Sequence, residues 1–122
     1  MYERIEAPSG VVAVKLGETL TAAEIAQLYT DVGLALGKHE RLHYYVDASD
    51  WSRLEFDAVL EGVKQRLLHL GWLSRFDRVA IVTPSAFVGG VAGLFGAVAP
   101  GMQLRCFAPD EAVAALSWVK DG

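Results

Sequence analysis

The sequence predicts an α/β fold: a mixed, mostly parallel five-stranded sheet with four helices, in the order β-β-α-β-α-β-α-β-α. Three observations predict it. After an opening hairpin, apolar strands alternate with amphipathic helices, as in parallel sheets with right-handed crossovers. The chain has 122 residues, of which 52% are hydrophobic, enough for one domain with a real core. Because no repeat or linker interrupts the pattern, we expect residues 1–122 to form a single domain.

The first elements follow from turn and capping residues. Strands are predicted at residues 2–7 and 11–16, with Pro8-Ser9-Gly10 between them as the turn. A helix then begins at Thr21, because Glu24 lies three residues later and completes a capping box. Gly37 is expected to end this helix.

A second strand-and-helix pair follows. Residues 42–48 form the third predicted strand, rich in Tyr and Val. Ser52 and Glu55 repeat the capping-box spacing, so the second helix is expected to begin there and to end at Gly71. The apolar face of this helix is formed by Phe56, Val59, Leu60, Val63, Leu67 and Leu70.

The last elements are a strand, a helix, a strand and a helix. Residues 78–82 form a continuous apolar strand, which is typical of strands covered on both faces. Residues 103–107 form the final strand. Asp110 is expected to cap a terminal helix that ends near Lys120.

The helix predicted between these two strands, residues 85–98, carries no charge and separates its side chains by size. Its glycines cost about 0.8–1.0 kcal/mol each relative to alanine. Such a helix is either buried between sheet and neighbour or contacts a partner. The partner readings are a homodimer, an apolar ligand and a membrane interface. The candidate contact residues are Phe87, Gly89, Val91, Gly93, Leu94, Phe95 and Val98.

A polar rim is predicted at the carboxyl ends of the third and fourth strands, where α/β sheets bind ligands. Its members are Asp47, Ser49, Trp51, Ser52, Thr83 and Ser85. Free backbone N–H groups at this edge could hold an anion or meet a protein partner. Helix and turn capping by the same residues is the alternative.

Charge and composition exclude several classes of function. The formal charge of -4 provides no basic surface for nucleic acid. The N-terminus lacks an apolar targeting segment, and a helix over 85–99 would cover about 22 Å, short of the ~30 Å needed to span a bilayer. We therefore expect a cytoplasmic protein, peripheral at a membrane if the apolar helix is exposed.

The residues that carry chemistry elsewhere do not form a catalytic pattern here. Cys106 lies in an apolar strand and is expected to be a buried, inert thiol. His39 and His43 have zinc-like spacing only if both lie on one helix. The predicted helix ends at Gly37, before both histidines, and a strand follows, so the spacing is wrong for zinc. Neither a G-x-S-x-G elbow nor a G-x-G-x-x-G loop in a strand-turn-helix setting is present. We expect no cofactor, no metal and no enzymatic activity.

Several segments together carry a family resemblance: GVVAV (10–14), LTAAE (20–24), FDRVAIV (76–82), RCF (105–107), PDEA (109–112) and ALSWV (115–119). With these the chain resembles the SpoIIAA-like proteins, bacterial relatives of the STAS domain of anti-sigma-factor antagonists. The resemblance implies a STAS-like fold and a non-enzymatic role in binding partner proteins.

The resemblance also implies a phosphoacceptor serine after the third strand. Asp47-Ala48-Ser49 looks like the aspartate-x-serine that precedes the acceptor motif. The acceptor itself would fall near Asp57, where this chain has no serine. Ser49 and Ser52 are the remaining substitutes.

Two functions follow from these observations. SpoIIAA-like proteins are similar in fold to lipid-carrier domains, and the charge-free helix 85–98 favours binding of an apolar, lipid-like molecule or a membrane surface. The alternative is a STAS-type regulatory protein–protein interaction module that lacks the usual phosphoserine. Self-association through helix 85–98 is compatible with both.

Overall fold

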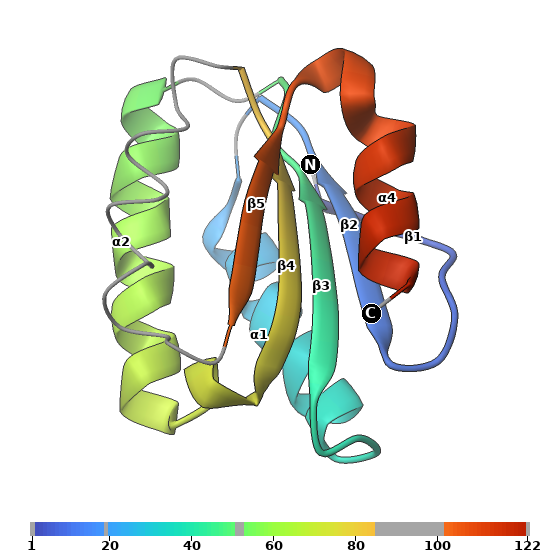
Figure 1. Ribbon diagram of the computed structural model, residues 1–122. Coiled ribbons are helices and arrows are strands. Elements are labelled where there is room, and N and C mark those ends of the chain that lie inside the picture. The colour runs from blue at the N-terminus through green and yellow to red at the C-terminus, as the bar shows by residue number, and fades with distance from the viewer. Residues whose placement is uncertain (1, 19, 51–52, 85–101, 122) are drawn as a thin grey trace.

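The computed structural model describes residues 2–18, 20–50, 53–84 and 102–121, except for the side chains of residues 53–58 and 60 (Figure 1). The described elements are β1 (Tyr2–Ile5), β2 (Val11–Leu16), α1 (Ala22–Leu36), β3 (Leu42–Asp47), α2 (Arg53–Leu70), β4 (Phe76–Val82), β5 (Gln103–Phe107) and α4 (Ala112–Lys120). Short 3₁₀ turns precede β4 at Leu73–Arg75 and α4 at Pro109–Glu111.

The five strands form one sheet in the order β1-β2-β3-β4-β5. The hairpin pair β1 and β2 is antiparallel, and the three pairs from β2 to β5 are parallel. The strands therefore follow the order of the chain across the sheet, as consecutive crossovers of one hand require. The predicted helix 85–98 and its candidate contact residues lie outside the described residues, so that prediction stays open.

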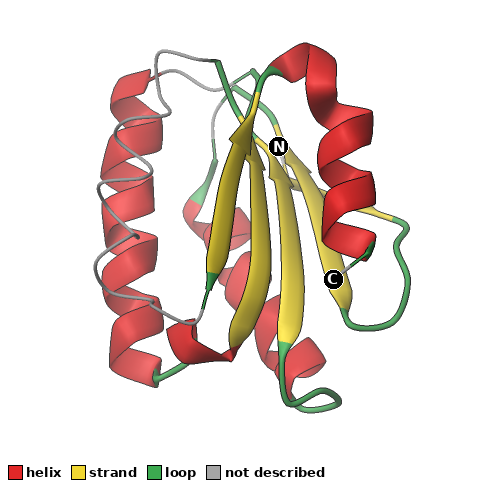
Figure 2. Cartoon of the chain, viewed as in Figure 1, coloured by secondary structure: helices red, strands yellow, loops and turns green. Residues whose placement is uncertain are grey.

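Helices cover both faces of the sheet (Figures 1 and 2). α1 and α2 lie on one face and α4 lies on the other. Because strand side chains alternate, the sheet contributes to two cores. The core beneath α1 and α2 contains Val12, Val14, Leu16, Val32, Leu36, Leu42, Tyr44, Leu67, Leu73, Phe76 and Ile81. The core beneath α4 contains Ala13, Tyr45, Ala80, Val82, Phe107, Ala115 and Val119.

Local sequence signals set most element ends. The Thr21 hydroxyl accepts from the Glu24 amide at 3.2 Å, and the Glu24 carboxylate accepts from the Thr21 amide at 3.0 Å, which confirms the capping box. Gly71 ends α2 with a φ of +72°, and Gly10 adopts +87° in the turn after β1. Side chains rarely adopt these values, so glycine is needed at both places.

Some predicted ends are wrong. β4 begins at Phe76 instead of residue 78, because Phe76 pairs with Leu42 before a bulge shifts the register. Asp110 does not cap the last helix: it lies inside the 3₁₀ turn, where the Glu111 carboxylate accepts from the Ala108 amide at 2.8 Å. Leu70, predicted on the apolar face of α2, is 39% exposed. The proposed cap at Ser52 lies outside the described residues.

Candidate functional site

The carboxyl ends of β3 and β4 lie side by side, because the two strands are parallel and Asp47 pairs with Val82. The backbone pairing continues beyond the strands. The Ala48 amide donates to the Val82 carbonyl at 2.8 Å, and the Thr83 amide donates to the Phe107 carbonyl at 2.9 Å. The structure thus places three predicted rim residues, Asp47, Ser49 and Thr83, at one edge. The other three, Trp51, Ser52 and Ser85, lie outside the described residues.

Asp47 and Ser49 form a preorganised turn. One oxygen of Asp47, Oδ1, accepts from the Ser49 amide at 3.0 Å and from the Ser49 hydroxyl at 2.5 Å. These two bonds are the turn capping that was predicted as the alternative to a binding role for Asp47 and Ser49. It holds the serine hydroxyl in one position, and Ala48 between the two is fully buried.

Thr83 is the unusual member of the rim. It is fully buried, yet its hydroxyl has no hydrogen-bond partner within the part of the chain that the structure describes. The helix that Thr83 was predicted to cap, 85–98, lies outside the described residues, so that prediction stays open. A buried hydroxyl without a partner costs about 1–3 kcal/mol, so its retention calls for a reason other than stability.

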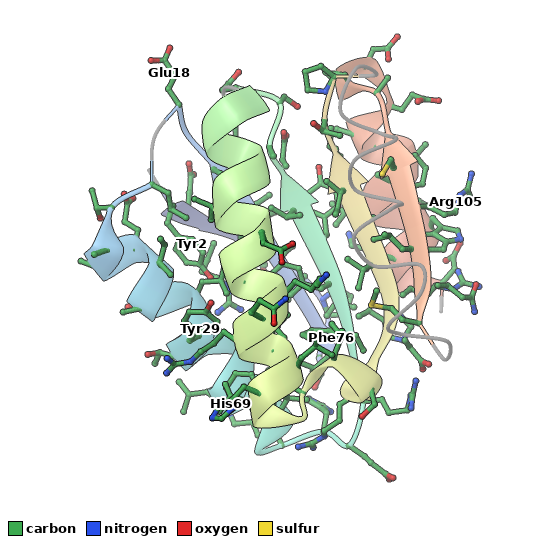
Figure 3. The ribbon with its side chains drawn as sticks, turned by 90° about the vertical axis from the view of Figure 1, so that its left-hand side faces the viewer. Tyr2, Glu18, Tyr29, His69, Phe76 and Arg105 are labelled. Atoms are coloured by element: carbon green, nitrogen blue, oxygen red, sulfur yellow. The ribbon has the colours of Figure 1, made fainter. Side chains whose placement is uncertain are left out.

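An apolar cavity lies between α1, α2 and the sheet. Its volume is about 110 Å³, and its exposed lining contains no polar surface. The lining residues come from both helices, from β2, β3, β4 and β5, and from the segments next to them: Leu16, Leu20, Leu28, Val32, Tyr44, Val46, Val59, Val63, Leu67, Leu73, Phe76, Val79, Ile81, Met102 and Leu104. In Figure 3 Phe76 lies behind α2, on the side of the helix that faces the sheet.

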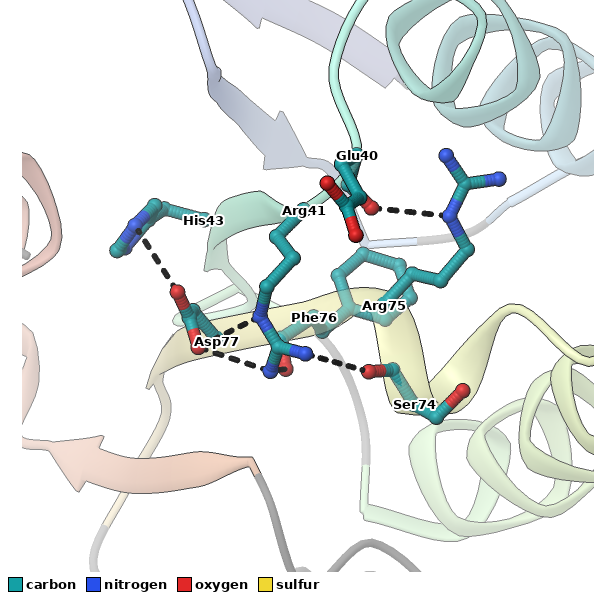
Figure 4. Close-up of polar contacts among 7 residues, drawn as sticks. All are labelled: Glu40, Arg41, His43, Ser74, Arg75, Phe76 and Asp77. Atoms are coloured by element: carbon teal, nitrogen blue, oxygen red, sulfur yellow. Dashed lines mark hydrogen bonds and ion pairs between the residues drawn. The ribbon is translucent and has the colours of Figure 1, made fainter.

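The amino ends of β3 and β4 carry an arginine cluster that the sequence reasoning did not single out (Figure 4). Arg41 pairs with Asp77 at 2.8 Å and donates to the Ser74 carbonyl at 3.1 Å. Arg75 donates to the carbonyls of Leu36, His39 and Glu40 at 2.9–3.0 Å. Leu36 is the last residue of α1, so Arg75 satisfies an acceptor that the helix terminus leaves unpaired and joins it to two carbonyls of the segment that follows.

His43 lies beside this cluster, with Nε2 3.9 Å from the Asp77 carboxylate. Burial lowers the pKa of His43, and the Asp77 carboxylate partly opposes this shift. The histidine is therefore a neutral neighbour of the cluster near pH 7. Its Nδ1 has no partner among the described residues.

A second missed cluster joins β1 to α1. Asp31 is 8% exposed and accepts from the Tyr2 hydroxyl at 2.8 Å and from the Gln27 amide at 2.9 Å. Arg4 approaches the same carboxylate at 3.5 Å. Burial and the carboxylate raise the pKa of Tyr2 far above its ordinary value. These three partners contact both oxygens of the Asp31 carboxylate. The cluster therefore links the edge strand β1 to α1.

Groups needed for catalysis do not converge in the described residues. No set of three or more His, Cys, Asp or Glu side chains there could hold a metal ion. Cys106 is half-buried, less than the sequence predicted, and burial raises the pKa of its thiol, which disfavours the reactive thiolate. None of the described helices is long and apolar enough to cross a membrane.

The fold and the rim define a small α/β domain built around a mixed sheet, with its preorganised polar turn at the carboxyl ends of the parallel strands. A family model places it more narrowly: the SpoIIAA-like model matches residues 11–120, and the chain belongs to the SpoIIAA-like family. Searches of curated proteins and of solved structures gave no match.

Proposed function

We propose that this protein is a non-enzymatic regulatory module of the STAS type, which binds a partner protein through the rim formed by Asp47, Ser49 and Thr83. Membership of the SpoIIAA-like family supports the class of function. The observation that carries the location is the buried Thr83 hydroxyl, which lacks a described partner beside the fixed Asp47–Ser49 turn. Polar groups that cost stability are characteristic of functional sites.

The chemistry of the rim fits a partner that provides hydrogen-bond donors. Asp47 Oδ1 accepts from Ser49, and the second carboxylate oxygen, which has no partner among the described residues, is available to a partner's N–H or O–H group. Phosphorylation of Ser49 would place a second negative group against Asp47 and open this turn by repulsion. Regulation by phosphorylation at Ser49 is therefore compatible with this chain, although Asp57 stands where the resemblance implies the acceptor serine.

The test compares partner capture by three forms of the tagged protein: wild type, Ser49→Arg and His69→Arg. His69 is exposed near the C-terminal end of α2, remote from the rim, and its substitution introduces the same side chain (Figure 3). We expect a partner that the wild type and His69→Arg both retain and that Ser49→Arg loses. Identical partner sets for all three folded proteins would refute the rim as the binding surface.

A second candidate function is supported by the apolar cavity. At about 110 Å³ it is smaller than the ~150 Å³ cavity that holds benzene in an engineered protein, so it suits a compact apolar molecule and not an acyl chain. Lipid binding, membrane association and a homodimer were all predicted from helix 85–98, and those readings stay predictions.

Native mass spectrometry of the purified protein tests this second function. A stoichiometric compound that is lost on denaturation, and that Val63→Phe excludes by filling the cavity, would support it. Val113→Phe, at a side chain that is 86% exposed on α4, is the matched control. An apo protein, or a compound retained equally by Val63→Phe, would count against it.

A further inference from the structure

Two arginines and two aromatic rings meet where α4 packs on β4 and β5. The Arg105 guanidinium carbon lies 4.9 Å from the Phe107 ring centroid and 5.3 Å from that of Trp118. The Arg78 guanidinium carbon lies 4.9 Å from the Trp118 centroid. The two rings are 6.0 Å apart at 51°. We call Arg78, Arg105, Phe107 and Trp118 the arginine–aromatic surface.

The two arginines differ in what their N–H groups do. Arg78 is half-buried and donates to the Trp118 carbonyl at 2.7 Å, so it caps the last turn of α4. Arg105 is exposed on β5, the edge strand of the sheet, and Figure 3 shows it projecting outward beside α4. Its side chain makes neither a hydrogen bond nor an ion pair to any residue in the described ranges. Its role in the fold is limited to stacking.

Stacking prepares Arg105 to bind an anion. The guanidinium lies over both rings, where cation–π attraction holds it, and its N–H groups have no acceptor within the described ranges. A side chain held in this way loses less conformational entropy when a partner binds. The planar fork of donors matches a carboxylate in a bidentate arrangement. Arginine and tryptophan are also the residues that most often dominate binding at protein interfaces.

We infer that the arginine–aromatic surface binds an acidic segment of a partner protein, with a carboxylate on Arg105 and apolar atoms against Trp118. Charge complementarity selects this occupant. The net charge of -4 disfavours the polyanionic surfaces of nucleic acids and membranes, whose binding needs clusters of basic residues. One stacked guanidinium suffices for a single carboxylate. This surface is distinct from the rim and does not depend on it.

The test is an NMR titration that follows backbone amides and the Trp118 indole N–H. The probe is the peptide acetyl-EVEVE-amide, and acetyl-QVQVQ-amide is its uncharged control. We expect the acidic peptide to shift the signals of Arg105, Phe107 and Trp118, and to bind about tenfold more weakly to Arg105→Gln. Binding should also weaken as sodium chloride is raised.

Matched variants distinguish the contribution of the planar N–H donors of Arg105 to peptide binding from the contribution of its charge. Lys120→Gln removes a charge from an exposed residue of α4, the helix that carries Trp118. This variant should bind the acidic peptide nearly as well as wild type. Arg105→Lys keeps the charge but loses the planar fork, so it should bind several-fold more weakly. Ser49→Arg, which disrupts the rim, should bind like wild type. Circular dichroism and thermal melting verify that each variant is folded.

Three results would overturn the inference. One is equal binding of the two peptides by the wild type. Another is unchanged binding of the acidic peptide by Arg105→Gln. The third is binding to vesicles of phosphatidylcholine and phosphatidylglycerol (3:1) that depends on Arg105 without any preference for the acidic peptide, since that would assign the surface to a membrane.

Discussion

Arg75 and Asp47 lie at opposite ends of the same parallel strands, and their polar groups are used differently. At the amino ends, Arg75 donates to the carbonyls of Leu36, His39 and Glu40, at and just after the end of α1. Arg41 pairs with Asp77 beside it (Figure 4). At the carboxyl ends, Asp47 holds Ser49, and the Thr83 hydroxyl next to it has no described partner. The two arginines at the amino ends satisfy acceptors that the fold creates, although His43 Nδ1 beside them also has no partner among the described residues.

The difference separates polar residues that maintain the fold from polar residues that are available for binding. A charged hydrogen bond to an otherwise unpaired carbonyl contributes to stability, while a buried hydroxyl without a partner reduces it. Removing the Arg75 side chain should therefore lower stability, whereas removing the Thr83 hydroxyl should raise it. The predictions below test this contrast, from the largest expected effect to the smallest.

Arg75→Ala should lower the free energy of unfolding by about 2–3 kcal/mol, because it leaves the Leu36 carbonyl at the end of α1 and two carbonyls just after it without their charged donor. Urea unfolding followed by circular dichroism measures this. Arg75→Lys is the control, which keeps the charge but bonds fewer carbonyls and should lose less. A loss below about 0.5 kcal/mol for Arg75→Ala would show that water replaces the arginine without cost.

Thr83→Val should raise the free energy of unfolding by about 1 kcal/mol, because it removes a buried hydroxyl that has no partner in the described part of the chain and keeps the shape of the side chain. The same substitution should weaken partner binding if Thr83 belongs to the rim. Thr83→Ser, which keeps the hydroxyl and loses a methyl group, should instead be destabilising. A loss of stability in Thr83→Val would mean that the hydroxyl is bonded within the fold.

Ser49→Ala should lower the free energy of unfolding by only about 0.5–1 kcal/mol, since it removes one hydrogen bond to a half-exposed carboxylate. Capture of the partner should fall much more than stability does. Thermal melting and partner capture on the same samples compare the two effects. Parallel losses in both measurements would make Ser49 a structural residue and weaken the contrast between the two ends.

His43→Gln should flatten the dependence of stability on pH. Because the pKa of His43 is lowered in the folded protein, the unfolded chain binds its proton first. Wild-type stability should then fall as pH decreases below about 6.5, the ordinary histidine value, until the folded pKa is passed. Asp77→Asn removes the group that raises this pKa, so the fall should continue to lower pH. Urea unfolding from pH 7.5 to 5 measures these curves, and equal slopes for wild type and His43→Gln would contradict the assignment.

The sequence was most informative where the signal is local. The capping box at Thr21 and Glu24, the end of α2 at Gly71 and the bounds of β5 were all predicted correctly. Each depends on residues a few positions apart or on the backbone freedom of one glycine. The rim was also partly predictable, because the order of strands and helices determines where parallel strands end.

Contacts between distant segments could not be predicted. Arg75 bonds residues 35 to 39 positions away, Tyr2 reaches Asp31 across 29 positions, and Arg105 stacks on Trp118. An arginine in the sequence indicates a charge, and nothing in its neighbours shows which carbonyl or ring it will meet. The bulge that brings forward the start of β4 also depends on its partner strand, β3.

The sequence by itself determined the family, the order of the described strands and helices, and the edge at which Asp47, Ser49 and Thr83 lie. These follow from local periodicity, caps and turns, which are decided by short-range sterics and hydrogen bonding. Tertiary structure alone decided which polar groups have hydrogen-bond partners. The carbonyls at and just after the end of α1 accept from Arg75, whereas the Thr83 hydroxyl is buried without a described partner. Whether a polar group has a hydrogen-bond partner depends on packing between segments far apart in the chain. That packing distinguishes the residues that stabilise this fold from those that we propose bind a partner.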